Sequence, residues 1–81
     1  MEKSMLYRLR RAERRVSEGY AHIAQQRKIL AELIQAGQTE AVKRASEILA
    51  QSEDIQASHI ADRGRCSEEL SALARRGALG R

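Results

Sequence analysis

The chain has 81 residues, of which 42% are hydrophobic and 32% are charged, and it contains no proline, phenylalanine or tryptophan. The scarcity of aromatic residues argues against a β fold, and the proportion of hydrophobic residues argues against a chain disordered by composition. The net charge of +4, the single cysteine and the lack of an apolar leader or bilayer-length apolar run predict a cytoplasmic, all-α protein of one domain.

A first helix is expected over residues of about 5–36. Ser4 can cap its start, and Gly37 suits the left-handed conformation that ends many helices. Two heptad rows along this segment are typical of a coiled-coil-like helix. The first row is Leu9, Val16, Ile23 and Leu30, and the second is Met5, Ala12, Gly19, Gln26 and Leu33.

Residues 37–39 are expected to form the loop, and a second helix is expected over residues of about 40–76. Thr39 can cap the second helix, and residues 77–81 are expected to be a frayed basic tail. Because the loop is so short, the two helices must be antiparallel neighbours. The sequence therefore predicts one domain, an antiparallel two-helix hairpin over residues 1–76.

The second helix has a weaker seam than the first. One row is Ala45, Ser52, His59, Cys66 and Leu73, and the row predicted beside it is Ala41, Ile48, Ile55, Asp62 and Glu69. Folding at the loop places Gly19 opposite Gln56, where the missing side chain would let the glutamine lie across the first helix. A polar seam is expected inside the hairpin, formed by Gln26, Ser52, Gln56, His59 and Arg63.

One flank of the seam is apolar. A hairpin is a single layer, so two helices cannot cover an apolar flank in addition to their own seam. A second copy against this flank would complete a dimeric four-helix bundle. The residues expected at the dimer interface are Leu6, Tyr20, Ile34, Val42, Leu49 and Leu70.

The pattern G-x-x-H-I-x-x-Q from Gly19 to Gln26, followed by Q-x-x-H-I-x-x-R from Gln56 to Arg63, resembles a group of short, uncharacterised α-helical proteins of rhizobia and related alphaproteobacteria. The resemblance covers most of the chain, although Cys66 and the arginine-rich start depart from the pattern. It implies a bacterial origin and brings no activity, cofactor or partner with it.

The histidines and the cysteine are the candidates for chemistry. His59 and Cys66 lie two turns apart on one helix, about 10 Å along its axis, which is too far for a shared metal ion or an activated thiol. His22 and His59 each have a carboxylate at helical spacing, but neither pair forms a known metal motif. We therefore expect no catalytic, cofactor or metal residues, and a protein that is not an enzyme.

The arginines of the first helix are the candidates for an anionic partner. Residues 1–36 carry eight Lys/Arg against four Asp/Glu, whereas residues 37–81 carry seven of each. No base-reading motif accompanies them, so contact would be with phosphates. The residues that could contact a polyanion are Arg8, Arg11, Arg15 and Arg65.

These features favour a non-enzymatic, self-associating helical hairpin that acts as an interaction or regulatory module. The partner is expected to be a second copy of the chain, or another protein, without contact to a membrane. A nucleic-acid-binding bundle that uses the arginine flank is the first alternative. A metal- or haem-binding bundle that uses the histidines is the weaker one.

Overall fold

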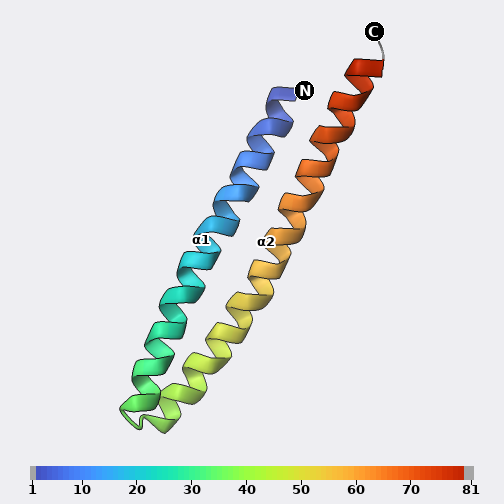
Figure 1. Ribbon diagram of the computed structural model, residues 1–81. Helices are drawn as coiled ribbons and strands as arrows, with labels where there is room; N and C mark the ends of the chain where they lie inside the picture. The colour runs from blue at the N-terminus through green and yellow to red at the C-terminus, as the bar shows by residue number, and fades with distance from the viewer. Residues whose placement is uncertain (1, 80–81) are drawn as a thin grey trace.

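The computed structural model is a hairpin of two long α-helices (Figure 1), α1 over Glu2–Gln35 and α2 over Thr39–Leu79. The structure describes residues 2–79, with side chains for residues 3–77. The hairpin measures 66 × 14 × 14 Å, with a radius of gyration of 18.6 Å, whereas a compact domain of this length has one of about 12 Å. The predicted all-α hairpin is confirmed, and it is a rod one layer thick.

The turn between the helices ends α1 in the predicted way. Gly37 has a φ of 70°, the left-handed conformation that glycine adopts without steric cost. The Gln38 N–H donates to the Leu33 carbonyl and the Gly37 N–H to the Ile34 carbonyl, each at 3.1 Å. This pair of bonds is the Schellman motif, which satisfies carbonyls left free at a helix end.

The helix bounds differ from the prediction at three points. Ser4 lies inside α1, which begins at Glu2. The Val42 N–H donates to the Gln38 carbonyl at 2.8 Å, so Gln38 occupies the cap of α2 and Thr39 belongs to its first turn. α2 also continues to Leu79, since a single glycine in this stretch does not end a helix, and the remaining two residues of the expected tail lie outside the described residues.

The core is a thin seam between the helices. Both predicted rows of α1 face α2, with Ala12, Val16 and Ile23 buried. On α2, Cys66 and Gln56 are the buried residues, and Cys66 belongs to a predicted row. The row of Gln56 is the second one that faces α1; it consists of Val42, Leu49, Gln56, Arg63 and Leu70, all buried or half-buried.

The prediction that the row of Ile48 faces α1 beside the row of Cys66 is wrong. Ile48 and Ile55 belong to it, yet they expose 46% and 56% of their surface. The two candidate rows lie on opposite sides of the Cys66 row and contain similar amounts of apolar surface. The choice between them depends on the contact of Gln56 with α1, which is a tertiary interaction.

Candidate functional site

A single polar contact ties the middle of α2 to the middle of α1. Gln56, which is only 4% exposed, donates from Nε2 to the backbone carbonyl of Val16 at 2.8 Å. A Cβ at Gly19 would overlap with Oε1 of Gln56 and lie 2.6 Å from its Cδ. The prediction that Gly19 makes room for Gln56 is confirmed.

The polar seam around this contact is only partly satisfied. The structure places Gln26, Ser52, His59 and Arg63 between the helices, each half-buried, on either side of Gln56. Within the described part of the chain, three buried atoms have no hydrogen-bond partner: Gln26 Oε1, Gln56 Oε1 and His59 Nδ1. Unpaired buried polar atoms lower stability, so this seam limits the stability of a single hairpin.

One long side of the hairpin exposes apolar and small residues, and we call it the Tyr20 face. Tyr20 and Ile34 expose 55% and 59% of their surface, and Leu6 lies in the same heptad row. A hollow of about 260 Å³ is lined by Tyr20 and Ala24 of α1 and by Ala57 and Ile60 of α2, among others. The Tyr20 face consists of Leu6, Glu13, Tyr20, Ala24, Arg27 and Ile34 of α1 and Ala57, Ile60 and Ala74 of α2.

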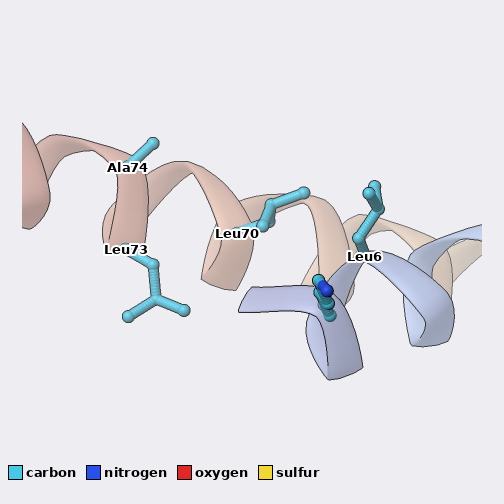
Figure 2. A pocket seen from close by; sticks show the side chains of 5 residues that line it. Leu6, Leu70, Leu73 and Ala74 are labelled. Atoms are coloured by element: carbon cyan, nitrogen blue, oxygen red, sulfur yellow. The ribbon is translucent and has the colours of Figure 1, made fainter. Parts of the chain in front are cut away.

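A second hollow lies on this face near the open end of the hairpin. It has a volume of about 330 Å³ and is lined by Lys3 and Leu6 of α1 and by Leu70, Leu73 and Ala74 of α2. In Figure 2, Leu6, Leu70 and Ala74 point to the same side of the hairpin. The lining is mainly apolar, so this hollow is suited to another apolar side chain.

Three of the six residues expected at a dimer interface are partly covered within a single hairpin. Val42, Leu49 and Leu70 belong to the row that faces α1 and are half-buried there. Of these three, Leu70 also borders the hollow beside Leu6. On α2, the apolar contribution to the Tyr20 face comes from the half-buried Ile60 and from the exposed Ala57 and Ala74. Sequence reasoning missed these residues because the apolar rows of α2 predict the wrong row beside that of Cys66.

The opposite side of the hairpin is charged near its open end. Arg8, Arg11 and Arg15 line a hollow of about 160 Å³ together with Asp62 and Cys66. Arg8 pairs with Glu69 at 3.6 Å and Arg65 with Asp62 at 3.5 Å. The Arg11 guanidinium lies 5.7 Å from the centre of the Tyr7 ring. The structure thus brings the three arginines of α1 together, whereas Arg65 is held by a neighbour on its own helix.

The charge is also unequal along the rod. Residues 2–18 and 60–79, which form the open half, carry ten Lys/Arg against six Asp/Glu, a net charge of +4. Residues 19–59, which form the half with the turn, carry four Lys/Arg against five Asp/Glu, a net charge of −1. Two copies therefore repel less when the open half of one lies beside the turn half of the other.

The two histidines meet at one hollow of about 150 Å³, which His22 and His59 line with Gly19, Ser52 and Gln56. Motif spacing along one helix cannot indicate this proximity, since the two histidines lie on different helices. Over the residues that the structure describes, no group of three His, Cys, Asp or Glu side chains is placed to hold a metal ion.

Comparison of the chain with protein-family models, with curated proteins and with solved structures finds no significant match. Neither helix, as far as the structure describes it, has a stretch long and apolar enough to cross a bilayer. The function must therefore be inferred from the surfaces described above.

Proposed function

We propose that the chain is a non-enzymatic, self-associating helical hairpin that acts as an interaction or regulatory module. Two copies would pack through their Tyr20 faces into a four-helix bundle. The observation that carries this proposal is the surface area of the hairpin, which is 6442 Å². A compact monomer of this mass exposes about 4900 Å².

The excess area has the size that a stable interface requires. Specific protein interfaces bury about 1600 Å² in total, or about 800 Å² per partner. The surplus surface of one hairpin, about 1500 Å², exceeds the area per partner. The Tyr20 face is the side best suited to be covered, because its side chains other than Glu13 and Arg27 are apolar or small and flank two hollows. Packing hairpin on hairpin would give each helix two neighbours, as in a four-helix bundle.

Sedimentation equilibrium at micromolar concentration tests the proposal. The unsubstituted chain should sediment as a dimer, and Tyr20→Glu should shift it to monomer, because the new carboxylate would be buried without a counter-ion. Arg44→Glu is the matched control, since Arg44 is exposed and lies outside the Tyr20 face. A compact, stably folded monomer of the unsubstituted chain at these concentrations would rule the proposal out.

A second candidate function is binding of nucleic acid through the arginines of the open half. It is favoured by the hollow that Arg8, Arg11 and Arg15 share and by the net charge of +4 on that half of the rod. Arginine clusters of this kind contact phosphates without reading the sequence. The hollow lies on the side opposite the Tyr20 face, so both functions could operate in one dimer.

A further inference from the structure

The heptad row of α1 on the Tyr20 face has a self-complementary order. Its residues are Leu6, Glu13, Tyr20, Arg27 and Ile34. Reversing the row about Tyr20 exchanges leucine with isoleucine and glutamate with arginine. Two copies of the row that run in opposite directions therefore match apolar with apolar residues and negative with positive ones.

We propose that the second copy docks with its α1 antiparallel to α1 of the first, on a two-fold axis that passes close to Tyr20. The proposal rests on the self-association described above and specifies its geometry. α2 then lies antiparallel to α2 of the second copy, and the turn of each hairpin lies beside the open end of the other.

The spacing along the helix fits this arrangement. Leu6 and Ile34 are each two heptads from Tyr20, about 21 Å along the axis. The two-fold axis therefore places Ile34 of the second copy at the apolar hollow bordered by Leu6 and Leu70. Ile34 exposes 59% of its surface in a single hairpin, and this contact would cover it.

The centre of the face fits the axis as well. The hollow of about 260 Å³ beside Tyr20 has Ala24 and Ala57 in its lining, so the helices can approach closely there. By symmetry, each tyrosine lies next to the hollow of the other copy. Tyrosine suits such a position, because its ring buries a large area and its hydroxyl group can keep contact with water.

The charges favour the same orientation. Glu13 is exposed, and Arg27, which already pairs with Glu53 at 2.9 Å, would lie between Glu53 and Glu13 of the second copy. The alternative bundle, with both turns at one end, sets α1 against α2 of the second copy and brings the two +4 halves together. Near the level of Glu13, α2 carries Arg63, which is half-buried in the row that faces α1, so the alternative bundle offers Glu13 a less accessible cation than Arg27.

Exchange of the two charges tests the proposal by sedimentation. Glu13→Arg and Arg27→Glu each replace two attractive pairs in the dimer by two repulsive ones, so each should raise the dissociation constant by about tenfold or more. A mixture of the two variants should form heterodimers of near-original affinity, because each arginine then faces a glutamate. The double variant Glu13→Arg/Arg27→Glu should also dimerise normally.

Two control variants separate the effect of the pairs between Glu13 and Arg27 from other effects of changing a charge. Glu53→Ala removes the ion pair within the hairpin and leaves both charges of the row in place, so it should change the dissociation constant by less than Arg27→Glu does. Glu18→Arg changes the net charge by the same amount as Glu13→Arg, at an exposed position of α1 outside the Tyr20 face, and should have little effect.

Cross-linking gives an independent readout of the orientation, in a Cys66→Ala background. Chains with Leu6→Cys and chains with Ile34→Cys should form a covalent dimer on oxidation when mixed, and neither should do so alone. If the unsubstituted chain is a dimer but the mixture gives neither heterodimers nor cross-links, the antiparallel geometry is overturned and self-association stands. If the unsubstituted chain is a monomer, both proposals fall.

Discussion

The side-chain amide of Gln56 occupies the space that a side chain at Gly19 would need. Its Nε2 donates to the Val16 carbonyl at 2.8 Å, and its Oε1 lies against the glycine. The residues one heptad before and after Gln56 in its row are Leu49 and Arg63, and neither has a side-chain amide. The contact therefore selects one register between α1 and α2.

Gly19→Ala should lower the free energy of unfolding by about 1–2 kcal/mol, since the new methyl group forces Gln56 to leave its buried position and its hydrogen bond. Without this clash, alanine in a helix interior would instead stabilise by about 1 kcal/mol. Urea denaturation followed by circular dichroism measures the change.

Gly64→Ala is the control for this substitution. Gly64 is also in a helix interior, and among the described residues nothing lies within 4 Å of a Cβ built there, so alanine should stabilise the hairpin by about 0.5–1 kcal/mol. The double variant Gly19→Ala/Gln56→Ala should recover the helix propensity of alanine at position 19. Equal effects of alanine at positions 19 and 64 would contradict the contact.

His59→Leu should raise the free energy of unfolding by about 1 kcal/mol, because it removes the buried Nδ1 that lacks a partner in the described structure and replaces it with apolar surface. For a chain of this size, that corresponds to an increase of about 4–8 °C in Tm. His22→Leu, at an exposed position, should change Tm much less. A loss of several degrees in the His59 variant would mean that the ring makes a hydrogen bond that the dimer alone provides.

Replacement of Arg8, Arg11 and Arg15 by glutamine should weaken retention on heparin and binding to DNA of any sequence. Each lost phosphate contact should reduce the slope of log K against log salt concentration by about 1. The loss of the exposed Arg8–Glu69 pair should cost about 0–1 kcal/mol of stability, so the variant stays folded. Arg44→Gln, in the half with the turn, is the control, and binding that ignores both salt and the triple substitution would remove the second candidate function.

Cys66 should react slowly with iodoacetamide in the native protein. Its side chain is buried between the helices, so alkylation requires the open end of the hairpin to separate. Labelling followed by mass spectrometry measures the rate of alkylation. The rate should rise in Leu9→Ala, which loosens the packing of α1 against Cys66. It should fall at higher protein concentration if dimerisation protects the hairpin. Alkylation of the native chain at the rate of the urea-unfolded chain would contradict this burial.

The sequence predicts the hairpin well, because its strongest signals are local. The heptad rows of α1 and the glycine at the turn each reflect a short-range requirement of the backbone, and both are found where expected. The pairing of Gly19 with Gln56 was predictable too, since a glycine in a helix interior calls for a packing reason.

The apolar rows of α2 do not by themselves predict the rotation of α2 about its axis. The rows that contain Ile48 and Leu49 lie on either side of the Cys66 row and are about equally apolar, so periodicity cannot choose between them. The choice follows from Gln56, whose hydrogen bond to Val16 turns Leu49 inward and leaves Ile48 exposed. For the same reason, the contribution of Ile60 and Ala57 to the Tyr20 face is visible only in the structure.

The tight turn at Gly37 has a consequence for how the chain folds during synthesis. Contacts next to the turn close small loops and those at the open end close larger ones, so pairing should start at the turn and proceed outward at a modest entropic cost per layer. While the ribosome is still making α2, the seam row of α1 around Leu9 has nothing to pack against. The part of α1 farthest from the turn is therefore made before its partners in α2 and is covered last, so it is the part of the hairpin that a chaperone would meet exposed.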